Sequence, residues 1–401
     1  MPGTLKRLAT EDGTVSPPPT KKKVQGTTTN KAVANFFKPA SQREPAKTTW
    51  RTIDDSLLVC TCVKSDPKVN ERPRKVAAFD FDSTLISSAS GNRFARDAND
   101  WKWWNSIVPG RLQELTAEGY LVVVLSNQAG ISLKSASKTA KTDMKRLTDF
   151  KTKVNAVLTH LDLPISLYAA TAHDKYRKPR TGMWDEFLKD QGLIHRDAVD
   201  LASSYFVGDA GGRTGSGAGG VAKDFSCSDR DLAANVGINF QTPEEFFLGE
   251  EARPFARAFD PTAYLRTVLP AKTETSPIVY TKKNPLDLVM FCGSPGAGKS
   301  TLYWKHLKPL GYERVNQDIL KTRERCLKAA TEFLSDNKST VIAQPQMNPE
   351  SRTMLPKVAF TGFASRYREP TLEEGFQDIT KIDFQFEGTD EQRAIWKKFW
   401  V

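Results

Sequence analysis

The sequence contains two motifs that handle phosphate groups for opposite purposes. Asp80 and Asp82 lie in the run Asp80-Phe81-Asp82-Ser83-Thr84, directly after an apolar stretch. A carboxylate in such a run can attack a phosphoryl group and remove it as an aspartyl-phosphate. Farther along, residues 293–300 read Gly-Ser-Pro-Gly-Ala-Gly-Lys-Ser, the spacing of a P-loop that holds nucleotide phosphates for transfer. A chain that both removes and adds phosphate predicts a substrate with two ends to process, such as a broken nucleic-acid strand.

The first motif predicts a phosphatase site with assigned roles. Asp80 is the expected nucleophile, and Asp82 is expected to protonate the leaving oxygen and later to activate water. Attack by a carboxylate requires that the phosphoryl oxygens be neutralised, which Mg²⁺ held by hard oxygen ligands achieves. Asp80, Asp82 and Asp209 are the predicted ligands of this ion. Ser126 offers a hydroxyl and backbone amides to the phosphate, and Lys178 offers a fixed positive charge.

The second motif predicts a kinase site with ATP as phosphoryl donor. Lys299 is expected to bridge the β and γ phosphates, and Ser300 is expected to bind Mg²⁺. The residues expected around the nucleotide are Gly293, Gly296, Gly298, Lys299, Ser300 and Thr301. Downstream, Asp318 is the candidate base that takes a proton from a 5′-hydroxyl. Arg325 is the candidate contact to the phosphate of a nucleic-acid acceptor.

The elements that must position the first site alternate between residues 73 and 248. Strands are predicted for the apolar runs 76–81, 121–125, 165–172 and 205–207. Apolar residues at helical spacing predict a helix over 143–161. This alternation predicts an α/β fold with a doubly wound parallel sheet. Because each polar motif follows a predicted strand, the site is expected at the carboxyl edge of that sheet.

Composition divides the chain into four predicted segments. Residues 1–48 form a basic tail that is expected to be disordered, because it has few large apolar residues. Residues 49–248 form the phosphatase domain, and 249–284 form a linker rich in Pro, Ala, Thr and charge. Residues 285–401 form the P-loop domain, whose first strand is predicted at 286–292.

The tail contains two short islands that suggest partners. Lys21-Lys22-Lys23 is a possible nuclear-import patch, and a solvated charge run is an equal alternative. Residues 30–37 resemble the sliding-clamp-binding box, with Val33 as the aliphatic residue and Phe36 and Phe37 as the aromatic pair. These three side chains would share one face of a helical turn, as binding in a groove requires. A generic adhesive motif is the alternative.

Bulk composition narrows the class of protein. Lys and Arg number 58 against 47 Asp and Glu, and the net charge of +11 favours a polyanionic partner such as DNA. Five scattered cysteines complete no zinc motif and indicate a reducing compartment. No apolar run is long enough for a bilayer, so we expect no membrane association. We expect a monomer located in the nucleus.

The order of the motifs resembles known families. Asp80, Ser126, Lys178 and Asp209 occur in the order and at the strand ends of the haloacid dehalogenase (HAD) superfamily of phosphatases. Residues 50–401 resemble the polynucleotide kinase 3′-phosphatases of DNA repair, in a form without an amino-terminal phosphopeptide-binding domain. The matching stretches are 176–184, 206–213, 224–230, 242–248, the P-loop and 370–376. The resemblance implies Mg²⁺ dependence, removal of 3′ phosphates and phosphorylation of 5′-hydroxyl ends.

The sequence departs from those families in three places. The second acid that many HAD enzymes carry soon after the Asp209 position is absent, and Asp229 is either its replacement or a helix cap. The short insert at 101–104 carries three tryptophans that either stack on a base or pack on the core. Beyond residue 343 about 40 residues of a kinase domain, including its arginine-bearing lid, are missing.

Three functions are therefore weighed. The first is a DNA end-processing enzyme that hydrolyses 3′ phosphates and, if its kinase domain is competent, phosphorylates 5′ ends. The second is a 3′-phosphatase whose P-loop domain serves only as a binding module. The third is a small-molecule HAD phosphatase fused to a nucleotide-binding domain. A non-enzymatic clamp-binding scaffold is disfavoured by the intact Asp80 and Asp82 pair.

Overall fold

The computed structural model describes most of residues 49–248 and 285–401 and part of the segment between them. It covers residues 48–62, 73–133, 140–195, 197–215, 222–257, 260–263, 280–282, 284–294, 296–343, 357–382 and 389–399. The predicted import patch at Lys21–Lys23 and the clamp box with Val33, Phe36 and Phe37 lie outside the described residues.

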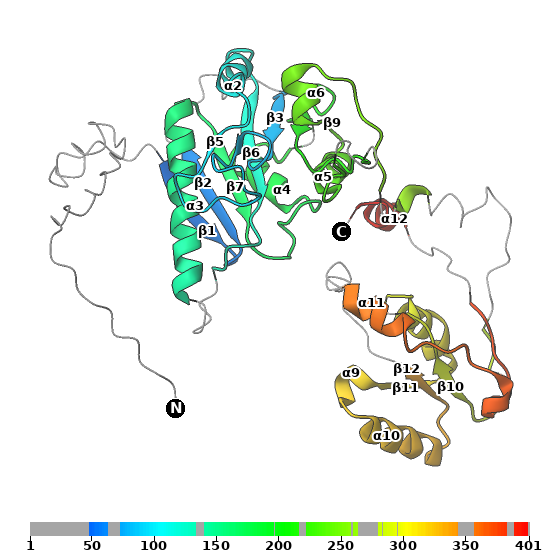
Figure 1. Cartoon of the computed structure of the whole chain (residues 1–401). Helices are drawn as coiled ribbons and strands as arrows, with labels where there is room; N and C mark the ends of the chain where they lie inside the picture. Colours follow the sequence, from blue (N-terminus) through cyan, green and yellow to red (C-terminus); the bar gives the residue numbers. More distant parts are fainter. Residues whose placement is uncertain are drawn as a thin grey trace, which may run out of the picture. The chain divides into compact units, whose positions relative to one another are not determined.

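The first domain is built on a seven-stranded sheet (Figure 1). Its strands run in the spatial order β1 (Thr48–Ile53), β2 (Leu57–Cys62), β7 (Ser166–Ala170), β6 (Leu121–Asn127), β3 (Val76–Phe79), β8 (Tyr205–Val207) and β9 (Asn239–Gln241). The strands from β7 to β9 are mutually parallel, as predicted. The sheet is nevertheless mixed, because β1 and β2 pair antiparallel with each other and β2 pairs antiparallel with β7.

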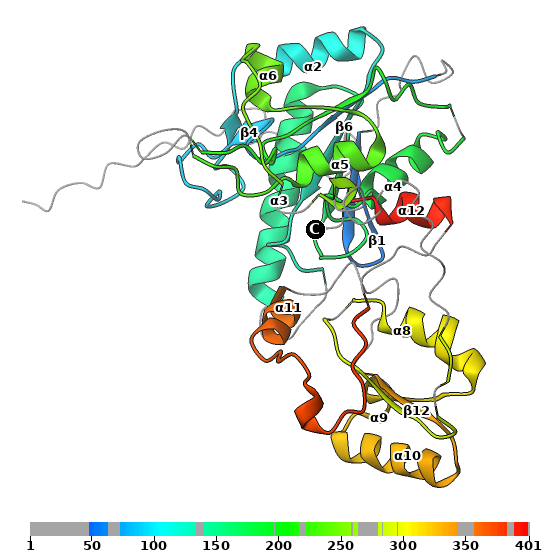
Figure 2. The same cartoon turned by 90° about the vertical axis from the view of Figure 1, so that its right-hand side faces the viewer.

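Helices cover both faces of this sheet, as expected for a doubly wound fold. The helices are α2 (Val108–Ala117), α3 (Ala140–Leu161), α4 (Gly182–Asp190), α5 (Ser228–Val236) and α6 (Pro243–Leu248). Leu112, Phe150 and Phe247 place α2, α3 and α6 in one buried cluster. Trp184 and Leu232 place α4 and α5 in a second cluster. Figure 2 shows α3 on one side of the sheet and α4 on the other. The strands alternate between the two clusters, because successive side chains of a strand point to opposite faces.

The segment that follows β3 adds little regular structure to the first domain. Residues 80–120, all of them described, contain only α2 and a hairpin of β4 (Ile86–Ser87) and β5 (Lys102–Trp103). Trp101, Trp103 and Trp104 are partly buried and pack against the α3-side core. Of the two roles considered for these tryptophans, the structure favours packing over base stacking.

The P-loop domain has a much smaller core. Three parallel strands lie in the order β10 (Leu288–Phe291), β12 (Thr340–Ala343) and β11 (Glu313–Asn316). The helical segments that follow β10 in the chain are α8 (Lys299–Leu302), η2 (Tyr303–Leu307), η3 (Lys308–Leu310), α9 (Gln317–Leu320), α10 (Arg323–Ser335), α11 (Lys357–Ala364), η5 (Leu372–Glu374) and α12 (Asp390–Trp396). Among the described helices none is both long and apolar enough to cross a membrane.

The strand order of the first domain determines where a site can form. The chain passes from β3 to β6 and β7 on one side of β3, and returns to β8 and β9 on its other side. The connections therefore reverse direction at β3, and α/β sheets bind ligands beside the carboxyl ends of strands at such a reversal. Asp80 follows β3 at this point.

Candidate active site

Three of the predicted residues meet at the carboxyl ends of neighbouring strands. Asp80 follows β3, Ser126 lies at the end of β6, and Asp209 comes two residues after β8. The backbone N–H of Asp80 donates to the carbonyl of Val207 at 2.8 Å, which ties the first acid to the strand that carries the third. The parallel pairing of β3 with β6 and β8 thus brings together residues that are far apart in the sequence.

Lys178 places its ammonium group between two carboxylates. Its Nζ atom lies 2.8 Å from Asp80 Oδ1 and 2.9 Å from Asp229 Oδ1. The residue is 3% exposed, so its charge is held almost entirely by these acids. The segment after β7 is fixed in turn by Asn127, whose amide accepts from Lys178 N at 2.9 Å and donates to Lys178 O at 3.2 Å. A cation held so firmly beside Asp80 can stabilise charge on a transferred phosphoryl group.

Asp229 lies beside Asp80, Asp209 and Lys178. It lies in the first turn of α5, twenty residues after Asp209, and is 1% exposed. Its Oδ2 atom accepts from Ala210 N at 3.1 Å, and its own N–H donates to Ala210 O at 3.1 Å. Gly208 makes this approach possible, because a Cβ there would lie 2.2 Å from Asp229 Oδ2. Of the two roles left open by the sequence, the structure favours the active-site acid.

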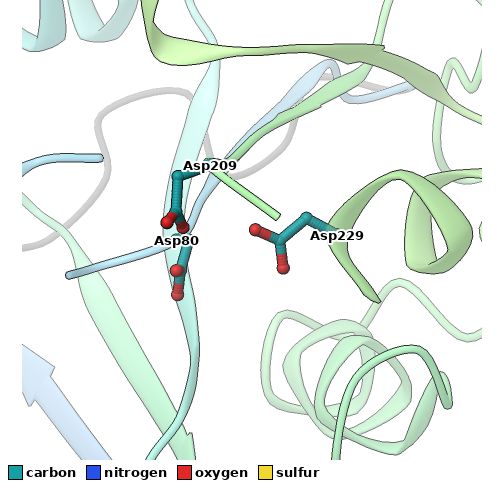
Figure 3. Close-up of side chains that lie close together, drawn as sticks. All are labelled: Asp80, Asp209 and Asp229. Carbon is teal, nitrogen blue, oxygen red and sulfur yellow. The ribbon is translucent and has the colours of Figure 1, made fainter. Parts of the chain in front are cut away.

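Asp80, Asp209 and Asp229 form a compact cluster of carboxylates (Figure 3). One oxygen of each lies within 4.8 Å of the others. Burial, together with the charges of Asp80 and Asp229, raises the pKa of Asp209 to about 8. Hard oxygen ligands that repel one another in this way suit Mg²⁺, which binds carboxylates and keeps several waters. The residues present therefore fit the predicted metal ion.

The carboxylate of Asp82 lies outside this three-acid cluster. Its Oδ2 atom accepts from Gln128 Nε2 at 2.6 Å, and the same amide nitrogen lies 2.9 Å from Ser126 Oγ. Asp82 as a whole residue is exposed. The pKa of its carboxyl group is nevertheless raised, chiefly because protein atoms around that group displace water and further because of the charge of Asp80. A raised pKa favours the protonated form that a general acid needs. The roles of Asp82 as metal ligand and of Ser126 as phosphate contact remain predictions.

Gln128, Asn127 and Asp229 had no firm role in the sequence analysis. Gln128 and Asn127 directly follow Ser126, so their position at a strand end is a signal that sequence reasoning could have used. Asp229 had the weaker signal, because only the fold shows that α5 returns to the strand ends.

The P-loop has the expected backbone but an inward-turned lysine. Gly296 and Gly298 adopt positive φ angles of 78° and 86°, which other residues adopt rarely. Lys299 Nζ donates to the carbonyls of Gly293 and Ser294, each at 2.8 Å. Ser300 Oγ is buried without a hydrogen-bond partner among the described residues. A buried hydroxyl without a hydrogen-bond partner beside a glycine loop suits coordination of the Mg²⁺ ion of a bound nucleotide. Lys299 would then bond to phosphate oxygens in place of the two carbonyl oxygens. Thr301 follows on an exposed position.

The other two kinase predictions receive no support from geometry. The side chain of Asp318 lies outside the described residues. Arg325 is exposed in the first turn of α10, where its N–H donates to the capping hydroxyl of Thr322 at 3.3 Å. Both assignments therefore remain predictions.

Known proteins resemble both halves of the chain. Residues 75–247 match the family described as "Polynucleotide kinase 3 phosphatase", and residues 288–360 match "AAA domain". A "Bifunctional polynucleotide phosphatase/kinase" of Schizosaccharomyces pombe is 37% identical over 375 residues, with 83% of this chain and 84% of the relative covered. A "Putative bifunctional polynucleotide phosphatase/kinase" of Acanthamoeba polyphaga mimivirus is 31% identical over 317 residues, with 75% and 71% covered.

A third relative matches only the first half. The "Polynucleotide 3'-phosphatase" of Saccharomyces cerevisiae is 28% identical over 224 residues, which are 45% of this chain and 90% of that protein. The alignment to the S. pombe protein has 375 positions but includes only 83% of 401 residues, so roughly forty positions lack a residue of this chain. With both domains present in order and most of the S. pombe protein covered, this chain belongs to the bifunctional polynucleotide phosphatase/kinase family.

Proposed function

We propose that this protein hydrolyses 3′-phosphate ends of DNA through an aspartyl-phosphate formed on Asp80. The observation that carries this proposal is the ion pair of Lys178 with Asp80 and Asp229 beside Asp209, at the reversal point of the sheet. The choice of a 3′-phosphate end, rather than a small phosphate ester, follows the names of the relatives that match this domain.

The side chains support a two-step reaction. An oxygen of Asp80 attacks phosphorus, the bond from phosphorus to the 3′ oxygen breaks, and Asp82 gives that oxygen its proton. Asp82, now ionised, then takes a proton from water as the water attacks phosphorus and releases Asp80 and inorganic phosphate. Mg²⁺ bound by Asp80, Asp209 and Asp229 would supply charge neutralisation at the phosphoryl oxygens. Lys178 holds Asp80 in place for the attack, and its charge can stabilise the phosphoryl group during both steps.

Exposed aromatic side chains beside the site support a polynucleotide substrate. Phe94 is 77% exposed and Phe225 is 87% exposed. The guanidinium of Arg93 lies over both rings, 5.4 Å from the centroid of Phe94 and 5.1 Å from that of Phe225. Phe225 lies between Asp224 and Ser226, which both bond to the turn after Asp209. Rings and a guanidinium at this position suit stacking by an unpaired base near the phosphate.

The P-loop domain supports nucleotide binding more strongly than phosphoryl transfer. Its glycine loop, Lys299 and Ser300 suit ATP and Mg²⁺, but its described sheet has only three strands. About 40 residues are also missing relative to the S. pombe protein. Loss of a single transition-state arginine costs on the order of 10³-fold or more. We therefore propose that the 3′-phosphatase is the main activity and that 5′-kinase activity is weak.

The cellular role follows from these activities. A 3′ phosphate blocks ligation and synthesis, so its removal would serve the repair of DNA strand breaks. A protein with this role is expected in the nucleus. Binding of a sliding clamp through residues 30–37 is an additional proposal, tested by replacing Phe36 and Phe37 with Ala in a clamp pull-down. Unchanged capture would reject the box. A monomer is expected and is checked by analytical ultracentrifugation.

The substrate class is tested by comparing two phosphate esters. We expect a 3′-phosphorylated oligonucleotide to be hydrolysed in Mg²⁺ with a kcat/KM at least about 10³-fold above that of histidinol phosphate, since only the polymer can contact Phe94, Phe225 and Arg93. Equal or reversed efficiencies would favour the small-molecule phosphatase. Asp80→Asn, which keeps the size of the side chain, is the control for activity of the Asp80 site.

A further inference from the structure

The turn that follows Asp209 is bonded at every amide to one downstream segment. The backbone N–H groups of residues 210–213 donate, in order, to Asp229 Oδ2 at 3.1 Å, Asp224 Oδ2 at 3.1 Å, Ser226 O at 3.0 Å and Asp224 Oδ2 at 3.0 Å. Arg230 Nε adds a bond to the carbonyl of Gly211 at 2.8 Å. Residues 224–230 therefore fix the conformation of this turn. The carboxylate of Asp224 alone accepts hydrogen bonds from two of the turn's four amides.

Arg213 closes the arrangement from the other side. Its Nε atom lies 2.9 Å from both oxygens of Asp224, and its Nη1 atom lies 2.6 Å from Glu244 Oε2. Its Nη2 atom donates to the backbone carbonyl of Asp209 at 3.2 Å. The Arg213 and Asp224 side chains are each 8% exposed, so these charge-assisted bonds are sheltered from water. One guanidinium thus connects the backbone of Asp209 to the carboxylate that holds the turn.

Two glycines show how closely the turn is held. Gly212 has a φ of +72°, and a Cβ there would lie 2.7 Å from Cys227 Sγ. A Cβ on Gly211 would lie 3.1 Å from the ring of Phe240. The turn therefore has little freedom to move while Asp224 and Arg213 remain in place.

We propose that Arg213 and Asp224 are positioning residues that set the affinity of the Asp80, Asp209 and Asp229 cluster for its divalent cation. This inference rests on the proposed metal-dependent phosphatase. Asp209 repels the other two acids, and a backbone fixed at its own carbonyl and at the next four amides keeps its carboxylate beside them. Groups that orient metal ligands in this way typically change metal affinity or activity by about 10- to 100-fold when they are replaced.

The test measures binding of Mn²⁺ alone to the full-length protein without nucleotide, by the loss of the free-ion signal in electron paramagnetic resonance. Asp209→Asn defines how much of the binding belongs to the acid cluster. We expect Arg213→Lys and Asp224→Asn to raise the Mn²⁺ Kd of that site about 10- to 100-fold. Glu244→Gln removes the negative charge from the outermost partner of Arg213 and should have a smaller effect.

Arg257→Lys is the matched control. Like Arg213, Arg257 pairs its Nε with a buried acid, Asp231 of α5, at 2.6 Å. Neither the Arg257 nor the Asp231 side chain bonds to residues 209–213 in the described hydrogen bonds. This variant should lower thermal stability and leave the Mn²⁺ Kd within about twofold of the wild-type value. Folding of every variant is checked by circular dichroism before binding is measured.

A second readout separates positioning from a general structural role. In phosphatase assays, Arg213→Lys and Asp224→Asn should raise the half-saturating Mg²⁺ concentration and recover much of kcat at saturating Mg²⁺. If the folded variants bind Mn²⁺ within twofold of wild type, the inference is overturned, even if activity falls. If either variant fails to fold, the other variant and Glu244→Gln decide the outcome. A wild type that binds Mn²⁺ as expected but hydrolyses no 3′ phosphate would refute the proposed function and leave this inference standing.

Discussion

The two phosphate motifs of this chain differ in how much structure stands behind them. Around Asp80, a lysine that is 3% exposed connects two acids, and helices cover both faces of the sheet. Around the P-loop, Lys299 bonds to the carbonyls of its own loop, and Leu288 and Met290 of β10 are 51% and 56% exposed. A complete motif is therefore not a complete site. Catalysis depends on the strands and helices that hold the motif in place. Among the described residues, the phosphatase domain has a seven-stranded sheet with two large buried clusters, whereas the P-loop domain has a three-stranded sheet with two small ones.

The largest effect that would sharpen this contrast is expected at Lys178. Lys178→Met removes the positive charge that lies between Asp80 and Asp229. The two acids then remain close together without a cation to pair with. Breaking a buried pair in this way costs about 3–5 kcal/mol of the free energy of unfolding. We expect that loss in urea denaturation, together with at least about 10³-fold lower 3′-phosphatase kcat.

Lys189→Met is the control for Lys178, because Lys189 pairs with Glu186 at 3.8 Å on the surface of α4. It should change stability by less than about 0.5 kcal/mol. A stable, active Lys178→Met variant would show that the phosphatase site is less interdependent than we infer.

The next effect concerns the repulsion within the acid cluster. Asp209→Asn should abolish phosphatase activity but raise the melting temperature measured in EDTA above about pH 8, where Asp209 of the wild type is ionised and the variant holds two carboxylates instead of three. Mg²⁺ should stabilise the wild type and not the variant. A lower melting temperature for Asp209→Asn in EDTA would contradict the proposed repulsion.

The pH dependence of the metal-free protein follows from the same acid. The pKa of Asp209 is raised from its usual value of 3.8 to about 8 in the folded state, chiefly by burial. The folded protein therefore holds this proton over a range where the unfolded chain has released it, and stability falls as pH rises from about 4 to 8. Thermal unfolding in EDTA should show this trend in the wild type and a weaker trend in Asp209→Asn.

A smaller effect is expected at the exposed rings. Replacing Phe94 and Phe225 together with Ala should raise KM for a 3′-phosphorylated single strand about tenfold and change kcat little, since base stacking contributes about 1–3 kcal/mol per base. The rings are surface groups, so stability should not fall. A substrate with abasic residues at its 3′ end should show no difference between variant and wild type. An equal loss on that substrate would exclude stacking.

The smallest effect tests the weaker half of the comparison. Lys299→Ala should leave 3′-phosphatase kcat/KM within about twofold of wild type and abolish the stabilisation of the protein by ATP and Mg²⁺. Thermal shift with and without nucleotide measures the second point. ATP binding that survives Lys299→Ala would show that the nucleotide does not use this loop.

The position of Asp80 and Asp209 at the strand ends could be predicted because both acids follow strands. Residues 76–79 and 205–207 form parallel strands that are largely buried, and such strands place the residues that follow them at one edge of the sheet. Asp80 and Asp209 then lie close together because their strands, β3 and β8, are neighbours in the sheet. The predicted helix over 143–161 is also present, with three more residues at its start.

Other features depended on contacts that no local pattern records. The role of Asp229 depends on the return of α5 to the strand ends, and the sequence separates it from Asp209 by twenty residues. The antiparallel β1 and β2 lie in the region predicted only as the start of the phosphatase domain, and Leu57 to Cys62 lacks the alternation of a half-exposed strand because most of it is buried. The contact between Arg213 and Asp224 was not predicted, although both residues lie in stretches, 206–213 and 224–230, that resemble the polynucleotide kinase 3′-phosphatases.

The contrast between the two motifs is tested most directly in one reaction. A nicked duplex with a 3′ phosphate and a 5′ hydroxyl at the nick is incubated with the full-length protein, Mg²⁺ and ATP, and both termini are read by mass spectrometry. We predict complete loss of the 3′ phosphate, prevented by Asp80→Ala, with little or no 5′ phosphate formed. Retention of the 3′ phosphate by the wild type, or rapid 5′ phosphorylation that Lys299→Ala removes, would contradict this account.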